Sequence, residues 1–460
     1  MAYTRRKSHE ITVGNIRLGG SNPIRVQSMT NTSTMDTEAS VAQILRIAEA
    51  GGELVRLTTQ GTREAENMEL ISKAVRQAGC SVPLVADVHF NPNVADVAAH
   101  YCEKVRINPG NYVDAARQFK QLEYTDEQYA QELQKIEARL LPFLGICREH
   151  GTAVRIGVNH GSLSDRIMSR YGDTPEGIVE SCMEFLRICV RHDFMNVVIS
   201  IKASNTVVMV QSMRLLVQEM EKEGMTFPLH LGVTEAGEGE DGRIKSAVGI
   251  GALLTEGIGD TIRVSLSEAP EKEIPVARQL VDMIPECHRL RQEAEAGIKD
   301  DTVTLRLQAS SLEELQLKAA MAVGAIFIDK KAHLLNIEAE GFAEDTLRDL
   351  SDSILQAARI KFVKTEYISC PGCGRTLYDL EGTIHKIKAA TAHLKGLKIA
   401  IMGCIVNGPG EMADADYGYV GAARGKVSLY KAKECIEKNI PEEEAVERLL
   451  KFIEEDLKQQ

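Results

Sequence analysis

Residues 153–202 read AVRIGVNHGSLSDRIMSRYGDTPEGIVESCMEFLRICVRHDFMNVVISIK. Two short apolar runs, Ala153–Val158 and Asn196–Lys202, enclose the amphipathic stretch Thr174–His192. Apolar runs of that length predict strands, and a helical period of apolar residues between them predicts a helix. A strand, a helix and a second strand in this order are typical of a parallel unit with a right-handed crossover.

The same unit recurs on both sides of this stretch. Eight strands are predicted in the first 270 residues, at Ile24–Met29, Leu54–Thr58, Pro83–Val88, Lys104–Asn108, Ala153–Val158, Asn196–Lys202, Pro228–Val233 and Thr261–Leu266. Eight such units over about 250 residues predict a (β/α)8 TIM-type barrel. A doubly wound open sheet is the alternative, although such sheets usually have five or six strands.

The rest of the chain predicts two further parts. Residues 284–360 read as an insert or connector, with helices, one strand at Thr302–Leu307 and no Gly-rich loop. Residues 361–460 read as a separate α/β domain that contains a cysteine cluster. The predicted fold is therefore α/β, with a barrel over residues 1–283, the insert over residues 284–360, and a C-terminal α/β domain that carries the cysteine cluster over residues 361–460.

Composition limits the class of protein. The 460 residues are 44% hydrophobic and 26% charged, as in a globular chain, and the net charge is −12. That acidity argues against a nucleic-acid partner. We expect no membrane span, because no apolar run approaches about 18 residues. Ten Cys and no apolar segment typical of a secretory signal lead us to expect a reducing, cytoplasmic location.

Polar and charged residues gather where the predicted strands end. They are Arg56, Asp87, His89, Arg106, Asn108, Arg155, Asn159, Lys202, Ser204, Thr234, Glu235, Arg263 and Ser265. The carboxyl ends of barrel strands meet at one mouth, where the chemistry of this fold is found. Five of the eight strands end in a cation, and crowded cations repel each other unless an anion is bound. Because Arg forks match phosphate oxygens, a diphosphate ligand is predicted.

Four of these residues have alternative interpretations. Lys202 is also a candidate for a Schiff base with a carbonyl substrate, provided that its pKa is depressed. Glu235 suits general acid or base catalysis, and an ion pair that orients an Arg is nearly as good an explanation. Asp87 and His89 are expected to hold a substrate hydroxyl or each other.

Three cysteines form the second cluster. Cys370 and Cys373 lie in a Gly/Pro turn, and Cys404 precedes another Gly/Pro loop that contains Glu411. Three thiolates from two loops suit a structural zinc or three irons of a 4Fe–4S cluster. A zinc ribbon usually has a second CxxC or a CxxH, so iron–sulfur is favoured. Cys435, expected on a helix, is a further candidate ligand; the other six cysteines read as buried apolar residues.

Long motifs resemble the 4-hydroxy-3-methylbut-2-enyl diphosphate synthase family of the non-mevalonate isoprenoid pathway. They are RIGVNHGSL from Arg155, KAS from Lys202, GIGDTIRVSL from Gly257, CPGCGR from Cys370 and GCIVNGPGE from Gly403. The resemblance implies reductive ring opening and dehydroxylation of 2-C-methyl-D-erythritol 2,4-cyclodiphosphate. It covers about Ile11 to Ile284 and Thr365 to the C-terminus.

The resemblance also implies roles for individual residues. The residues that would bind the cyclic diphosphate are Arg56, Arg106, Arg155, Asn159, Lys202, Arg263 and Ser265. Cys370, Cys373 and Cys404 would hold a 4Fe–4S cluster, with Glu411 as a ligand that substrate displaces. Asn407 and Glu235 match positions near the reacting carbons, and we expect Glu235 to protonate the departing hydroxyl. Ferredoxin or flavodoxin would supply two electrons.

The insert has about 75 residues, a length intermediate between the connectors of the family's two forms. The short form reacts across a head-to-tail homodimer, and the longer form has a third domain between the barrel and the cluster domain. A homodimer is expected, with closure of the site across the dimer or within one chain left open. Two rival functions remain from the residues alone. One is a barrel aldolase or isomerase with a Lys202 Schiff base and a C-terminal domain stabilised by a structural zinc. The other is an electron carrier or redox sensor in which the barrel is only a scaffold.

Overall fold

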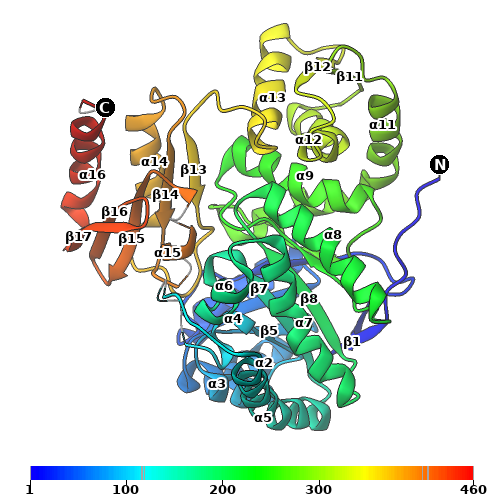
Figure 1. Cartoon of the computed structure of the whole chain (residues 1–460), viewed down its shortest axis with the longest axis vertical. Coiled ribbons are helices and arrows are strands. Elements are labelled where there is room, and N and C mark those ends of the chain that lie inside the picture. The colour runs from blue at the N-terminus through cyan, green and yellow to red at the C-terminus, as the bar shows by residue number, and fades with distance from the viewer. Residues whose placement is uncertain (1, 116–117, 119, 407, 412–413, 459–460) are drawn as a thin grey trace.

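The computed structural model describes residues 2–115, 118, 120–406, 408–411 and 414–458, with the backbone alone for Pro409 and Glu411. Asn407 and the side chain of Glu411 therefore lie outside the described residues. Figure 1 shows a barrel below, the insert above it, and the C-terminal domain to one side of the insert and over the barrel.

The barrel prediction is confirmed. Parallel strands pair in the order β8-β7-β6-β5-β4-β3-β10-β9. A parallel bridge from Ile199 to Leu229 joins β8 to β9 and closes the ring. The strands are β3 (Arg25–Met29), β4 (Leu54–Thr59), β5 (Leu84–Val88), β6 (Lys104–Ile107), β7 (Ala153–Asn159), β8 (Val197–Lys202), β9 (His230–Leu231) and β10 (Thr261–Ile262).

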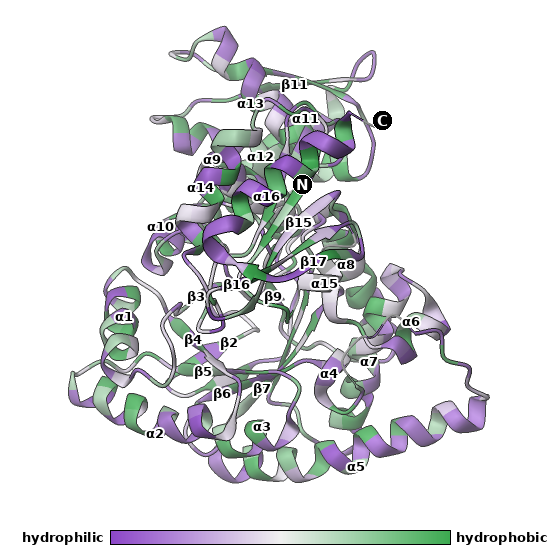
Figure 2. Cartoon of the chain, turned by 90° about the vertical axis from the view of Figure 1, so that its left-hand side faces the viewer, coloured by the Kyte–Doolittle hydropathy of each residue, from purple (hydrophilic) through white to green (hydrophobic). Residues whose placement is uncertain are grey.

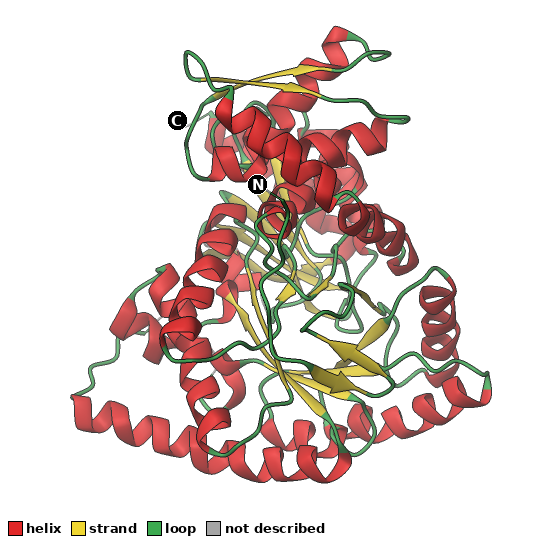
Figure 3. Ribbon diagram, turned by 90° about the vertical axis from the view of Figure 1, so that its right-hand side faces the viewer, coloured by secondary structure: helices red, strands yellow, loops and turns green. Residues whose placement is uncertain are grey.

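Helices surround this sheet (Figure 3). The longer ones are α1 (Thr37–Glu49), α2 (Thr62–Gln77), α5 (Asp126–His150), α7 (Pro175–Arg191), α8 (Thr206–Lys222), α9 (Gly239–Thr255) and α10 (Glu273–Asp282). Shorter helical segments lie between them: α3 (Pro92–Ala98), α4 (Pro109–Tyr112), η1 (His160–Ser162), α6 (Asp165–Tyr171) and η2 (Pro270–Lys272). α5 begins with a capping box of Thr125 and Gln128 and ends at Gly151, whose φ of 68° favours glycine. Its polar and apolar residues alternate along the outside of the barrel in Figure 2.

A small hairpin covers the amino end of the barrel. β1 (Ile11–Val13) pairs antiparallel with β2 (Ile16–Leu18). Val13 and Leu18 are fully buried in a cluster with residues at the strand starts, among them Leu54 and Ala153. This end is therefore packed with apolar side chains, which leaves the carboxyl end for a site.

The insert packs directly on the barrel helix α9. It comprises α11 (Ile284–Ala296), β11 (Thr302–Arg306), α12 (Leu312–Ile328), β12 (Leu334–Glu338) and α13 (Glu344–Ala357). A side chain on Gly251 of α9 would meet Met321 at 2.6 Å, so glycine permits the close approach of α12. The expected strand and helices are present, and β12, which pairs parallel with β11, was not expected. Because one hydrophobic core runs through the barrel and the insert, the division into domains stays a prediction.

The C-terminal domain is built on a five-stranded sheet in the order β13-β14-β15-β16-β17. Its elements are β13 (Glu366–Ser369), α14 (Leu380–Thr391), β14 (Lys398–Met402), α15 (Gly408–Glu411), β15 (Tyr417–Ala423), β16 (Lys426–Lys431), β17 (Glu434–Pro441) and α16 (Glu442–Leu457). It has its own core around Ile384 and Leu429. In the part of the chain described here, no helix has both the length and the apolar character needed to cross a bilayer.

The expected position of Cys435 on a helix is wrong. Ala432 and Lys433 reverse the chain, with Ala432 at a φ of 48°, and Lys431 then pairs with Glu434. Cys435 therefore lies on β17, where its thiol donates to the carbonyl oxygen of Glu437 at 3.5 Å.

Candidate active site

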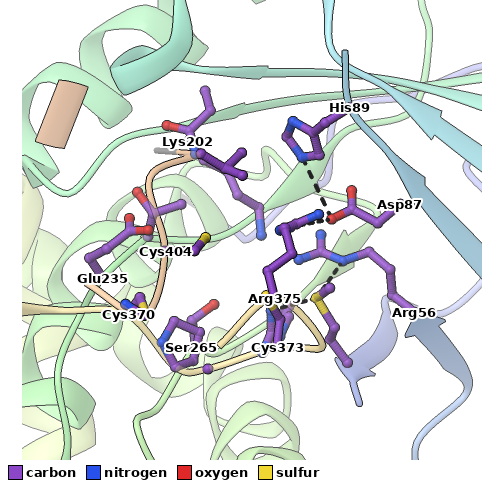
Figure 4. A pocket seen from close by; sticks show the side chains of 18 of the residues that line it. Arg56, Asp87, His89, Lys202, Glu235, Ser265, Cys370, Cys373, Arg375 and Cys404 are labelled. Atoms are coloured by element: carbon purple, nitrogen blue, oxygen red, sulfur yellow. Dashed lines mark hydrogen bonds and ion pairs between the residues drawn. The ribbon is translucent and has the colours of Figure 1, made fainter. Parts of the chain in front are cut away.

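A cavity lies at the carboxyl end of the barrel, beneath the C-terminal domain (Figure 4). The space between its walls, including the part open to solvent, is about 790 Å³. Its lining comes from both domains: Met29, Arg56, Asp87, His89, Arg106, Arg155, Val158, Asn159, Ser200, Lys202, Thr234, Glu235, Arg263 and Ser265 from the barrel, and Cys370–Cys373, Arg375, Met402–Cys404, Val406 and Gly408 from the C-terminal domain.

Most of the predicted site residues meet here. All five strand-end cations line the cavity, together with Asp87, His89, Asn159, Glu235, Ser265 and the three cysteines. Ser204 does not line it, since the residue is buried beyond the end of β8. Asn407 and the carboxylate of Glu411 are outside the described residues, so the structure places only the Glu411 backbone, at the end of α15.

Asp87 is the main negative charge among the cations. Its carboxylate accepts hydrogen bonds from Arg106 at 2.9 Å and from Arg375 at 3.2 Å. Burial acts to raise the pKa of Asp87, yet the charges of Arg56 and Arg106 hold that pKa well below its usual range. The carboxylate is therefore ionised.

His89 is held neutral in the same group. Burial, and then the charge of Arg106, lower the pKa of His89 to about 3, although Asp87 opposes the shift. A neutral imidazole has one nitrogen that accepts, and Nε2 of His89 accepts from Nη1 of Arg106. His89 is consequently available as a neutral hydrogen-bonding group at ordinary pH.

The other cations differ in whether a carboxylate of the protein neutralises their charge. Arg263 donates two hydrogen bonds to Glu273, at 2.8 and 2.9 Å. Arg155 is fully buried, and its Nε and Nη1 have no hydrogen-bond partner among the described residues. Burial and then the charges of Arg56 and Arg106 lower the pKa of Arg155 well below its usual range. Such an arrangement is costly when empty and favours an anionic ligand.

Lys202 is in a similar environment. Burial, followed by the charges of Arg56 and Arg155, lowers the pKa of Lys202 well below its usual value. The depressed pKa meets the condition set above for Schiff-base chemistry, and the same cationic neighbours also meet the condition for a multiply charged anion. Geometry alone therefore keeps both interpretations of Lys202 open.

The three cysteines project toward the cavity from two loops. Cys370 and Cys373 lie between β13 and α14, and Cys404 lies between β14 and α15. The backbone N–H of Gly403 donates to Sγ of Cys370 at 3.2 Å. Burial raises the pKa of Cys370, with smaller contributions from the nearby Cys404 and Cys373. Three mutually interacting thiols beside the cavity fit the donor set of a three-thiolate cluster.

No group of three His, Cys, Asp or Glu side chains within the described ranges has the spacing of a metal site as it stands. Cys435 lies on β17 and is not part of the cavity lining. His385 and Lys388 lie on α14 and pair with Glu238 at 3.2 and 3.3 Å. His385 therefore contacts a carboxylate outside the cavity and does not join the three cysteines.

The C-terminal domain closes over the barrel of its own chain. Ser267 donates to the carbonyl oxygen of Cys370 at 2.9 Å, and a parallel bridge joins Ala236 to Ser369. On the other side of the mouth, Gly410 of α15 sits against the backbone of Gly161, where an added side chain would overlap the Gly161 carbonyl. In this structure the cavity is therefore formed by the barrel and the C-terminal domain of one chain.

Sequence reasoning missed one charged residue of the cavity. Arg375 reaches it from the cysteine loop and pairs with Asp87 of β5. Its position two residues after Cys373 was the available signal. Glu235 has a φ of 50°, a left-handed conformation that costs energy for a residue other than glycine and is typical of functional sites.

Fold and site together define a barrel enzyme whose cation-lined mouth is covered by a cysteine-bearing domain of the same chain. The sequence model of the GcpE TIM-barrel domain matches residues 8–278, and that of the GcpE protein C-terminal domain matches residues 366–455. The chain belongs to the GcpE family.

Curated relatives match along the whole chain. A protein of Bacteroides thetaiotaomicron is 53% identical over 99% of this chain and 99% of its own length. Proteins of Porphyromonas gingivalis and Leptospira interrogans are 43% and 36% identical, each over 99% of this chain and 98% and 97% of their own lengths. All three are named 4-hydroxy-3-methylbut-2-en-1-yl diphosphate synthase (flavodoxin). The first alignment spans 605 positions, so that relative contains segments absent from these 460 residues.

Proposed function

We propose that the cavity is where this oxidoreductase converts 2-C-methyl-D-erythritol 2,4-cyclodiphosphate to (E)-4-hydroxy-3-methylbut-2-enyl diphosphate. The overall reaction takes up two electrons and two protons, opens the ring at a C–O bond to phosphate and releases one water. The activity follows from the family and from the name that its relatives share. The observation that supports this location is a ring of buried cations facing three cysteines across one cavity.

The cations would bind the diphosphate. Arg155 offers two buried N–H groups without a partner among the residues described. Arg56, Arg106, Lys202 and Arg263 would surround the same anion, with Asn159 and Ser265 as neutral donors. Two negative phosphates would relieve the repulsion between these cations, and this relief is the main source of affinity. Asp87 and His89 lie beside the cations, where they would orient a substrate hydroxyl.

Cys370, Cys373 and Cys404 would hold a 4Fe–4S cluster, with Glu411 as the non-cysteine ligand. When bound, the cluster would supply the two electrons one at a time to the substrate carbons. The chain's own contribution is to hold the substrate against the cysteine loops and to exclude water. Exclusion of water strengthens every charge interaction inside the cavity.

Glu235 is our proposed proton donor. It lies at the cavity wall after β9, is 4% exposed, and directly precedes Ala236, which bridges to Ser369 at the start of the first cysteine loop. A carboxylic acid there would give its proton to the departing hydroxyl so that it leaves as water. Asn407 would act near the same carbons.

The electron donor would be a flavodoxin, which the relatives' names specify, or a ferredoxin. The homodimer, the absence of a nucleic-acid partner and the cytoplasmic location remain our expectations from the sequence. Closure in one chain means that a dimer is not needed to complete the cavity.

The test is an absorption spectrum with iron and sulfide assays on protein purified without oxygen. We expect a brown protein with about four irons per chain, which converts the cyclodiphosphate when reduced. A colourless protein with one zinc per chain, even after attempted cluster reconstitution, would contradict the mechanism. Borohydride with substrate then distinguishes the aldolase alternative, because only a Schiff base on Lys202 is trapped.

A further inference from the structure

Arg375 carries a positive charge from the cysteine domain into the barrel cavity. It follows Cys373 by two residues and is only 9% exposed. Figure 4 shows it among the cavity side chains, next to Asp87 and Arg56. Among the described residues, it is the cation of the cavity lining that comes from the C-terminal domain.

The guanidinium of Arg375 is only partly satisfied. Nη2 donates to Asp87 at 3.2 Å, whereas Nε and Nη1 are buried and have no partner in the described part of the chain. Arg155, from β7 on the opposite domain, likewise has Nε and Nη1 buried without described partners. Buried donors of a charged group cost free energy unless an acceptor pairs with them. Two domains thus present unpaired guanidinium donors to one cavity.

We propose that Arg375 binds the substrate diphosphate directly, together with Arg155, so that the anion joins the cysteine domain to the barrel. The inference rests on the proposed function and adds a ligand contact from the second domain. Binding of the anion then strengthens docking of the domains, and docking strengthens binding of the anion by the same factor.

Asp87 does not account for the buried Nε and Nη1 donors of Arg375. Asp87 already accepts from Arg106 and occupies only Nη2 of Arg375. Arg375 also interacts with Cys404 and Cys373, so a role confined to the cysteine loop is the competing explanation. That explanation predicts no contribution to anion affinity when the cluster is absent.

The experiment measures the affinity of inorganic pyrophosphate for the full-length, cluster-free chain by calorimetry. Loss of a charge-assisted contact of this kind should weaken binding about 10- to 100-fold in Arg375→Gln. Arg375→Lys keeps the charge and should recover part of the affinity. Lys388→Gln is the matched control, since Lys388 also crosses between the domains, to Glu238 at 3.3 Å, but is outside the cavity. It should bind pyrophosphate like the unaltered chain.

Each result has a distinct meaning. Equal affinity in Arg375→Gln and the unaltered chain overturns the inference. So does an equal loss in Lys388→Gln, because the effect would then report domain docking alone. If the unaltered chain does not bind pyrophosphate, the proposed diphosphate pocket itself fails, and with it this inference.

Discussion

The guanidinium of Arg375 lies 3.2 Å from the carboxylate of Asp87, and this ion pair joins two domains inside the candidate active site. Asp87 also pairs with Arg106 at 2.9 Å, so one carboxylate has a cationic partner from each domain. A change in the position of the cysteine loop would therefore change how many cations Asp87 neutralises in the barrel mouth.

Asp87→Asn should destabilise the ligand-free chain. It leaves Arg106 and Arg375 buried without their anion, a loss of about 3 kcal/mol for a broken buried pair. We expect a thermal midpoint several degrees lower, measured by calorimetry. Asp301→Asn, which removes an exposed ion pair with His333, is the control and should change the midpoint little. An unchanged midpoint in Asp87→Asn would show that the pair is not stabilising.

Arg155→Met should stabilise the ligand-free chain while it weakens anion binding. The substitution removes a buried charge that is repelled by Arg56 and Arg106. Apolar replacement of buried charges can stabilise by about 1–4 kcal/mol. Calorimetry should show a higher thermal midpoint, and pyrophosphate affinity should fall about 100-fold. A lower midpoint would mean that Arg155 is compensated in the ligand-free state.

His89→Gln should reduce the acid sensitivity of folding. Because the pKa of His89 is lowered to about 3, mainly by burial, the unfolded chain binds this proton first as the pH falls below about 6.5. Stability from a neutral His89 is therefore present above that pH and declines between pH 6.5 and 3. Near pH 5 the slope should drop by about one proton, ~1.4 kcal/mol per pH unit. Unfolding titrations between pH 4 and 6.5 test this, and an unchanged slope contradicts it.

Cys404→Ser should lose iron, whereas Cys435→Ser should retain it. Cys404 lines the cavity with Cys370 and Cys373. Cys435 lies on β17, where its thiol donates a hydrogen bond to the backbone carbonyl of Glu437. Iron and sulfide assays after anaerobic reconstitution measure the difference. Loss of iron in both variants would assign Cys435 a ligand role that its position in the sheet does not suggest.

Gly410→Ala should displace α15 from the barrel mouth, because the new methyl group would overlap the carbonyl of Gly161. We expect turnover to fall at least about tenfold through misplacement of the adjacent Glu411, with the barrel still folded. Gly145→Ala is the control, since a methyl group there contacts nothing within 4 Å. Full activity in Gly410→Ala would show that α15 need not dock so closely.

Much of the fold could be predicted because its local signals agree. Runs such as Ala153–Val158 and Asn196–Lys202 are apolar over strand length and alternate with amphipathic helices, and all eight predicted strands lie in the barrel. β12 and β17 could not be found in the same way. β17 has half-exposed residues and depends on pairing with β16, and β12 has a single buried residue, Ile337. Pairing of this kind comes from tertiary contacts.

The site shows the same limit. Arg56, Arg106 and Arg155 could be grouped from the sequence because strands of one barrel end at one mouth. Arg375 could not, because its place in the cavity depends on how a second domain docks. Ser204, two residues beyond Lys202, illustrates the converse, since proximity along the chain to a cavity residue did not bring it into the lining.

Closure of the cysteine domain over its own barrel has a genetic consequence. A chain damaged at Arg155 and a chain damaged at Cys404 each lack one half of the same cavity, and pairing the two in a cell would restore neither. Activity per chain should likewise survive dilution. If the active site were formed across a dimer, such mutants would complement each other and activity would fall on dilution. If it is formed within one chain, each mutant chain stays inactive whatever its partner.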